Sequence, residues 1–357
     1  MKQLSKVVGL TVGLDLGDRF SRFVILDAEG RILQEGRLGT DEAGLSRFFC
    51  DRAPMRIAIE TGTHSPWVSR QLAEYGHNVL VANSRKLRLI YENPNKDDRV
   101  DARYLARLAR FEPALLSPVE HRDASSQKDM ALLRSRDALV AARTLLVNHV
   151  RGVSKSFGKR LPACSTSCFP GSVLKQIPQL LEPVLCPLLE QIDSLSKQIK
   201  KLDRQIQTLA DANYPQTRLL RQVKGIGPIT SLTFILTLGH PQRFAKSRTV
   251  GAYLGLVPGR KQSGHSDPQR RITKQGDSGL RRLLVNAAHY ILGPFGPDCD
   301  LRRFGWKISS RGGKLAKKKA IIAVSRKLSV LLHHLWRTGE IYQPLHRSIR
   351  NSKAAVA

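Results

Sequence analysis

The sequence predicts an α/β domain at residues 1–158, a helical coiled-coil linker at 159–213, a mainly α-helical domain at 214–345 and a tail at 346–357. Three observations support this division. Strand-like apolar segments alternate with helical segments in the first part. An unbroken heptad pattern runs through the linker, and long apolar helical segments rich in basic residues make up the third part.

Short apolar segments separated by turn residues open the chain, and helical segments follow between further strands. In chain order we expect strands at 7–17, 19–27 and 32–38, a helix near 42–50, a strand at 56–60 (RIAIE), a helix at 65–76 and a strand at 78–83. A three-strand meander followed by alternating strands and helices predicts a mixed sheet. This order is typical of a ribonuclease-H-like domain.

The helical linker begins after a long basic helix, which we expect at residues 129–158. Residues 159–173 are rich in Pro, Ser, Cys and Gly and predict a loop. From Leu185 to Leu209 the apolar residues are spaced alternately three and four apart, which is the seam of a coiled coil. This favours a homodimer, which could assemble further into a tetramer. The alternative is a helix that packs on its own domain.

The last domain is the most basic part of the chain. The whole chain has 59 Lys and Arg against 29 Asp and Glu, a formal net charge of +30, and residues 214–357 account for +22 of it (27 basic minus 5 acidic). Such an excess favours a polyanionic partner, because bound cations release the counterions of phosphate groups. The alternative is a charge that serves solubility alone.

A Lys-Gly-Ile-Gly-Pro sequence at 224–228 lies between two apolar helical segments of this domain. It predicts a helix-hairpin-helix-like element, in which Gly225 and Gly227 let backbone amides approach a phosphate and Lys224 adds a charge. Residues 301–330 contain ten basic and no acidic residues. Both features favour nucleic acid as the partner.

The cysteines and the apolar segments indicate the cellular compartment in which we expect the protein. The five cysteines (Cys50, Cys164, Cys168, Cys186 and Cys299) are odd in number and irregularly spaced, which favours reduced thiols. The chain has neither an apolar run of membrane-spanning length nor the cleavage pattern of a signal peptide. We therefore expect no membrane partner and a cytoplasmic, nucleoid-associated protein of a prokaryote.

Carboxylates at strand and helix ends are the candidate catalytic groups. Asp15 ends the first strand, Glu60 ends RIAIE, and Asp98 and Asp101 share one face of a helix that begins near 98. Asp97 would point elsewhere. Each could instead be a turn residue or a helix cap. Together they predict a seat for Mg²⁺, a hard cation that prefers oxygen ligands and that Mn²⁺ could replace. Two such ions about 4 Å apart can activate a nucleophile and stabilise the oxygen that leaves a phosphodiester.

Three motifs, GLDLG, AIETGTHSPW and KDDRVDARYLARL, are similar to those of the DEDD transposases of bacterial insertion sequences, the insertion-sequence one-ten family. The segment from VKGIGPITSLTFI to RRLLVNAA resembles the second domain of that family. The resemblance covers about residues 8–345. It implies a RuvC-like first domain, Asp15, Glu60, Asp98 and Asp101 as metal ligands, and a guide RNA encoded by the element.

The resemblance also implies that Ser263, in RKQSGHS, is a nucleophile that forms a covalent link to DNA. From the residues alone a Ser-Gly in a polar loop is more often a turn, and Ser266 competes with Ser263 for the role. Nearby cations would stabilise charge in the transition state. The residues that we expect to contact nucleic acid are Lys224, Gly225, Gly227, Arg260, Lys261, Arg270, Arg271, Lys274, Arg281 and Arg282.

The sequence therefore favours a DNA transposase that excises and inserts its own element. One alternative is a junction-resolving endonuclease that uses only the acidic site, and another is a nucleic-acid-packaging protein without catalysis. A sugar-kinase-like phosphotransferase shares the GLDLG motif. It would need a second copy of the domain, and none is found.

Overall fold

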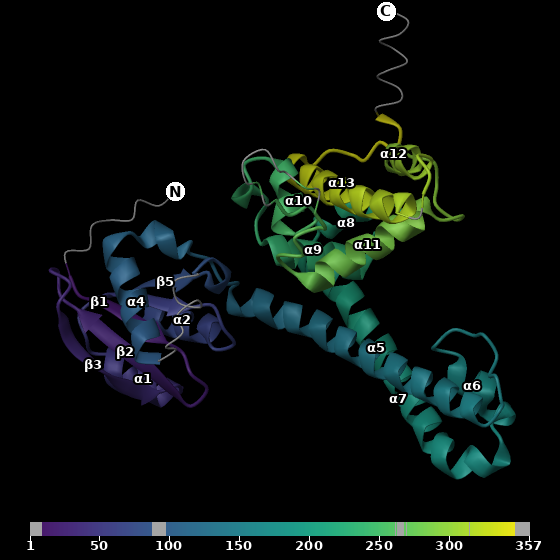
Figure 1. The fold of residues 1–357 in the computed structure, drawn as a ribbon, viewed down its shortest axis with the longest axis horizontal. Coiled ribbons are helices and arrows are strands. Elements are labelled where there is room, and N and C mark those ends of the chain that lie inside the picture. Colours follow the sequence, from purple (N-terminus) through teal and green to yellow (C-terminus); the bar gives the residue numbers. More distant parts are fainter. Residues whose placement is uncertain are drawn as a thin grey trace, which may run out of the picture. The chain divides into compact units, whose positions relative to one another are not determined.

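The computed structural model describes residues 9–87, 98–260, 262, 268, 270–313 and 315–346. The chain forms two compact units, Met1–Asp123 and Ala124–Ala357. Figure 1 shows the first as a sheet with covering helices and the second as an assembly of helices. The boundary after Asp123 lies earlier than the boundary after residue 158 that we expected. The long helix that follows Asp123 packs on helices of the second unit and therefore belongs to that unit.

The first unit contains a five-stranded mixed sheet with strand order β3-β2-β1-β4-β5. Strands β1, β2 and β3 pair antiparallel as the expected meander, whereas β4 and β5 continue the sheet in parallel with β1. The predicted mixed sheet is thus confirmed. The strands are β1 (Thr11–Asp15), β2 (Phe20–Leu26), β3 (Ile32–Gly39), β4 (Arg56–Glu60) and β5 (Asn78–Ala82).

Helices cover both faces of this sheet: α1 (Glu42–Phe49), α2 (Ser65–Glu74) and α4 (Asp98–Phe111). Side chains alternate along a strand, so each buried strand supplies both faces. Val12, Leu14 and Ile57 pack on one face with apolar residues of α1 and α2. The other face carries Ala58 and packs with α4. Small residues on both sides let α4 approach very closely.

The closest approach of α4 to the sheet is at Gly13. A Cβ atom at this position would lie 2.5 Å from the backbone nitrogen of Ala106 and would overlap the carbonyl oxygen of Ala102. Ala102 and Ala106 are fully buried. The helix backbone therefore lies almost directly on the strand backbone, which fixes the height of α4 above β1.

Helices make up the second unit. They are α5 (Ala124–Ser156), α6 (Phe169–Val173), α7 (Glu182–Asn213), α8 (Thr217–Arg221), α9 (Pro228–Leu238), α10 (Val250–Tyr253), α11 (Ser278–Leu292), α12 (Asp300–Ser309) and α13 (Ala316–Thr338). The segment 159–173, expected to be a loop, contains the short helix α6, because Phe169 and Val173 are apolar enough to be buried between α5 and α7.

The heptad seam lies on α7 and is buried within the chain. Its residues Leu185 and Ile192 pack with Val147 and Val150 of α5, and Ile206 packs with Met130 at the other end of α5. The helix thus packs on its own domain, which was the alternative to self-association. The heptad spacing correctly predicted an apolar seam, but α5 of the same chain covers it.

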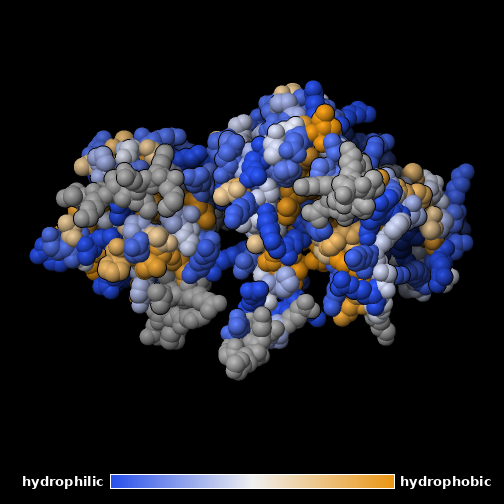
Figure 2. All heavy atoms as spheres, turned by 90° about the horizontal axis from the view of Figure 1, so that it is seen from above, coloured by the Kyte–Doolittle hydropathy of each residue, from blue (hydrophilic) through white to orange (hydrophobic). Residues whose placement is uncertain are grey.

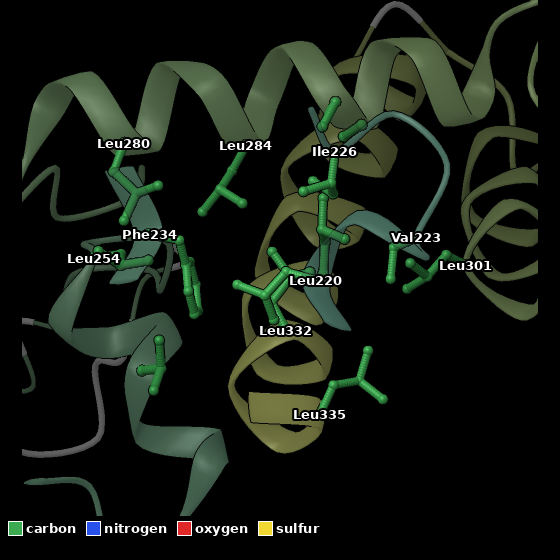
Figure 3. Close-up of a cluster of buried hydrophobic side chains, with 14 of the residues drawn as sticks. Leu220, Val223, Ile226, Phe234, Leu254, Leu280, Leu284, Leu301, Leu332 and Leu335 are labelled. Atoms are coloured by element: carbon green, nitrogen blue, oxygen red, sulfur yellow. The ribbon is translucent and has the colours of Figure 1, made fainter. Parts of the chain in front are cut away.

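The core of the second unit joins α8 to α13 (Figure 3). Leu220 and Phe234 of α8 and α9 meet Leu284 of α11 and Leu332 of α13, and all four are fully buried. The Gly-Ile-Gly sequence forms the turn between α8 and α9, as the hairpin pattern predicted. Of the helices that the structure describes, none is both long and apolar enough to cross a membrane.

Candidate functional site

Two of the four candidate carboxylates lie side by side at one edge of the sheet. Strands β1 and β4 pair in parallel with Leu14 opposite Ile59, and the next residues along the two strands are Asp15 and Glu60. Side chains alternate between the two faces along a strand, so Asp15 points to the same face as Gly13, and Glu60 to the same face as Ala58. Both carboxylates therefore lie on the face that α4 covers. Both side chains are half-buried.

The direction of α4 brings Asp101 to the same edge. Arg56, at the start of β4, donates from Nη1 to the carbonyl oxygen of Ala109 near the end of α4 (3.0 Å). Gly13, which pairs with Ala58 further along β4, lies against the earlier residue Ala102 of the helix, so helix and strand run in opposite directions. The strand from Arg56 to Glu60 spans about 13 Å, and the helix from Ala109 back to Asp101 spans about 12 Å. Asp101 is therefore level with Glu60, and it is only 6% exposed.

Asp98 is the first residue of α4, one turn before Asp101. Its side chain and the whole of Asp97 fall outside the described residues. We call Asp15, Glu60, Asp98 and Asp101 the acidic edge. Among the side chains that the structure describes, no three of the His, Cys, Asp and Glu type form a group that could hold a metal ion. The two strands end at Asp15 and Glu60 and α4 begins at Asp98, as the sequence predicted, whereas the convergence of these carboxylates on a metal ion stays a prediction.

Two histidines near Glu60 were not singled out from the sequence. Trp67 Nε1 donates to Nδ1 of His64 (3.1 Å), which leaves the imidazole proton on Nε2, 3.6 Å from Asp18 Oδ1. Ser65 Oγ lies 2.8 Å from Nε2 of His121. His64 could have been found from its place at the start of HSPW, in the same AIETGTHSPW motif as Glu60. The pairing of Ser65 with His121 joins residues 56 apart, and no local pattern signals it.

The pKa of His121 is lowered, first by burial and then by the neighbouring positive charges of Arg70 and Arg122. A neutral imidazole accepts or donates hydrogen bonds without adding charge to the site. Further support for the loop after Glu60 comes from Thr61, whose hydroxyl donates to Ser84 Oγ (2.8 Å) and accepts from the Ser84 backbone nitrogen (3.1 Å). This loop is therefore fixed by side-chain hydrogen bonds at both ends.

The expected nucleophile Ser263 and the neighbouring Lys261 lie outside the described residues. The stem that carries their loop is described. The backbone nitrogen of Gly259 donates to Arg271 O and that of Thr273 to Val257 O, both at 2.9 Å, and Pro258 pairs antiparallel with Ile272. The stem places three exposed cations on the two sides of the loop: Arg260, Arg270 and Arg271.

The Gly-Ile-Gly turn has two different glycines. Gly225 has a φ of +92°, and a Cβ atom there would lie 2.9 Å from Cδ1 of Tyr290, so its conformation and its packing both require glycine. Gly227 precedes α9 as its N-cap, and a Cβ atom there would meet nothing within 4 Å. Lys224 beside them is exposed. The turn therefore has open space beside Gly227.

The three remaining residues that we expected to contact nucleic acid, Arg281, Arg282 and Lys274, differ in their interactions within the protein. Arg281 donates from Nη1 to the carbonyl oxygens of Leu254 (3.0 Å) and Gln275 (2.7 Å), so its guanidinium supports the fold. Arg282 is exposed and forms an ion pair with Asp137 of α5. Lys274 is exposed at a positive φ of 56°. On the face shown in Figure 2, hydrophilic residues predominate in both units and apolar residues gather in separate patches.

Comparisons with known proteins agree with this layout. A DEDD transposase model of the IS110 group, described as Transposase, matches residues 12–157, and a model described as Transposase IS116/IS110/IS902 family matches residues 217–297. The first match contains both strand ends and α4, and the second contains the Gly-Ile-Gly turn and the stem of the Ser263 loop.

Curated relatives match most of the chain. A probable family 20 transposase of Pseudomonas aeruginosa is 29% identical over 288 residues, covering 79% of this chain and 83% of that protein. The transposase for insertion sequence element IS1328 of Yersinia enterocolitica is 30% identical over 285 residues, covering 79% and 83%. The transposase for IS1111A of Coxiella burnetii is 27% identical, covering 71% and 70%. Similarity of this extent, found in both units, shows that the chain belongs to the IS110/IS116 family of insertion-sequence transposases.

Proposed function

We propose that this transposase excises and inserts its own insertion sequence through Mg²⁺-dependent DNA cleavage at the acidic edge and a covalent intermediate at Ser263. The observation that carries the proposal is the register of β1 and β4 together with the antiparallel course of α4. It supports the proposal because the backbone positions of Asp15, Glu60 and Asp101 lie toward one end of the sheet, on the side that α4 covers. We assign the first domain a RuvC-like, ribonuclease-H-like fold on the basis of this strand order.

The donor set suits a hard divalent cation. Asp15, Glu60, Asp98 and Asp101 offer carboxylate oxygens, which are the ligands of Mg²⁺, and so many carboxylates near one edge repel one another unless a cation is shared. We propose that these four residues hold two Mg²⁺ ions, with Mn²⁺ as a substitute. When bound, the ions would neutralise charge on the phosphodiester and lower the pKa of a nucleophile.

The proposed role of Ser263 is to keep the broken phosphodiester bond in exchangeable form. Its Oγ attacks the phosphorus, one DNA oxygen leaves with a proton, and the serine proton passes to a base. The resulting phosphoserine bond is then attacked by a hydroxyl of another DNA strand, which releases the serine. Exposed Arg260, Arg270 and Arg271 beside the loop would stabilise the additional phosphate charge.

The proposed partners are the ends of the element, the target DNA and a guide RNA encoded by the element. The charge of +22 in residues 214–357 supports binding of either nucleic acid. We also propose a homo-oligomer, a dimer that could assemble into a tetramer, in the cytoplasm of a bacterium and associated with the nucleoid. Because α5 covers the heptad seam, such an oligomer needs a surface other than that seam.

The decisive experiment mixes the purified protein with labelled element ends, the flanking transcript and Mg²⁺, and looks for a covalent protein–DNA band on a denaturing gel. We expect the band with the wild-type protein and its loss in Ser263→Ala. Ser266→Ala is the matched control and should keep it. If Ser263→Ala still cuts DNA and the wild type never forms the band, the protein is a nuclease without a covalent intermediate. If cleavage survives in Asp15→Asn, the acidic edge is not the catalytic site.

A further inference from the structure

Three exposed aromatic residues belong to one stretch of the second unit, from the end of α11 to α12. Tyr290 is 43% exposed, Phe295 is 85% exposed and Trp306 is 48% exposed. We call these three residues the aromatic corner. One exposed aromatic residue is ordinary on a protein surface, but a group of three indicates a binding surface.

Arg302 holds the aromatic corner together. It is buried, and its Nη1 donates to the carbonyl oxygens of Ile291 (2.8 Å), Gly293 (2.7 Å) and Gly296 (2.6 Å). These carbonyls end α11 and flank Phe295. The Cζ atom of Arg302 lies 4.3 Å from the centre of the Trp306 ring. One guanidinium therefore fixes the segment that carries Phe295 and also packs on Trp306, so both rings are presented on an ordered backbone.

The aromatic corner adjoins the Gly-Ile-Gly turn, because Tyr290 occupies the space that a side chain at Gly225 would need. Exposed Lys224 lies in this turn, and exposed Lys307 and Arg311 follow Trp306 along the chain. Arg303 pairs with Asp298 (2.6 Å). Residues 301–330 contain ten basic and no acidic residues. The corner thus combines aromatic faces with a positive field.

We propose that the aromatic corner is a stacking platform for the unpaired bases of single-stranded DNA. Cations bind the backbone of duplex and single strands alike, whereas aromatic faces add affinity only where base faces are uncovered. Cutting and transferring strands produces such unpaired segments, so this inference rests on the DNA-processing function but not on the metal or the serine chemistry. A second copy of this chain fits less well, because it would bring another strongly positive surface to the corner.

The test measures binding of a short fluorescent oligo-dT strand by anisotropy without Mg²⁺, alongside a duplex of the same length. We expect Phe295→Ala and Trp306→Ala each to weaken oligo-dT binding about tenfold, the effect of one lost stacked base. Duplex binding should change less than about twofold. Trp306→Phe should keep most of the affinity. Phe295 is so exposed that we expect Phe295→Ala to leave the fold intact. This variant therefore keeps the test valid if Trp306→Ala fails to fold.

Phe157→Ala is the matched control, because Phe157 is also an exposed aromatic residue of the second unit (53%) but lies at the end of α5. It should leave oligo-dT binding unchanged. Equal losses in Phe157→Ala and Phe295→Ala, or an unchanged affinity in Phe295→Ala, would overturn the proposal. The proposal would also be overturned if these variants lost affinity only for an oligo-U strand, which would assign the corner to RNA. A loss of self-association with unchanged oligo-dT binding would overturn it as well. The Ser263 adduct can fail to form while oligo-dT binding behaves as expected, so the two proposals fail independently.

Discussion

The acidic edge of the first unit and the basic loop stem of the second contain residues for opposite tasks, and they are held in opposite ways. Asp15 and Glu60 are fixed by the register of two paired strands, and Asp101 by a helix whose backbone touches the sheet at Gly13. Arg260, Arg270 and Arg271 are exposed side chains around a loop whose stem is held by backbone hydrogen bonds, among them those of the Pro258–Ile272 bridge. Metal ligands need a fixed separation, whereas cations that meet a DNA backbone act over a longer range.

The strongest test of this difference is Asp15→Asn. We expect DNA cleavage and strand transfer to fall by at least about a hundredfold, because a proposed ligand of the ions that would stabilise developing charge is lost. DNA binding should be unchanged, since the cations of the second unit supply it. A gel-based cleavage assay and an anisotropy assay on the same preparation separate the two effects. Glu42→Gln, which removes an exposed acid at the start of α1 instead, should retain full cleavage.

Gly13→Ala tests whether backbone contact sets the height of α4. The new Cβ would overlap Ala102 O and lie 2.5 Å from Ala106 N, so the helix must move. We expect the free energy of unfolding to fall by about 1–3 kcal/mol, with cleavage impaired. Gly152→Ala in α5 is the opposite case, because a Cβ there meets nothing within 4 Å and alanine favours a helix by about 0.5–1 kcal/mol. Chemical denaturation that finds both substitutions neutral would contradict the close contact.

Arg281 and Arg282 are neighbours in the sequence but have different partners. Substituting each in turn therefore distinguishes an arginine that stabilises the second unit from one that we expect to bind DNA. Arg281→Ala removes two hydrogen bonds to carbonyls, and we expect a loss of about 1–3 kcal/mol in the free energy of unfolding with little effect on DNA binding. Arg282→Ala removes an exposed ion pair to Asp137 and should cost less than about 1 kcal/mol while weakening DNA binding. Thermal melts and anisotropy at two salt concentrations measure both, and the reverse pattern would show that Arg281 is the DNA contact.

A histidine with a lowered pKa lies in each unit, His121 in the first and His333 in the second, and these two predict the smallest effect. Burial lowers the pKa of His121, and burial is also the first cause of the lowered pKa of His333, whose nitrogens bond Ser247 Oγ and Pro241 O (both 2.9 Å). Because each pKa is lower in the folded state, the unfolded chain binds more protons at acid pH. Stability should therefore be intact above the ordinary value of 6.5 and decline as the pH falls below it. Melts between about pH 5 and about pH 8 should show a smaller slope in His333→Asn, and an unchanged slope would contradict this assignment.

The sequence predicted the sheet and the placement of Asp15, Glu60 and Asp101 because these depend on local periodicity and on the ends of short elements. It failed where a tertiary partner decides the outcome. The heptads of α7 reveal an apolar seam but not that α5 covers it. Phe169 lies in a segment rich in Pro and Ser, and its helix packs with apolar residues of both α5 and α7. Arg281 looks like any other cation in the sequence, although it donates to the carbonyl oxygens of Leu254 and Gln275, the first of which is 27 residues away.

The contact of α4 with β1 has a consequence for engineering. No side chain separates Gly13 from Ala102 and Ala106, so repacking the interior offers no means of adjusting the spacing of the carboxylates. A designer who wants a wider or narrower acidic edge must rebuild the helix register or the strand itself. Alterations of target preference are better sought on the exposed surfaces of the second unit, where side chains can be exchanged without disturbing a backbone contact.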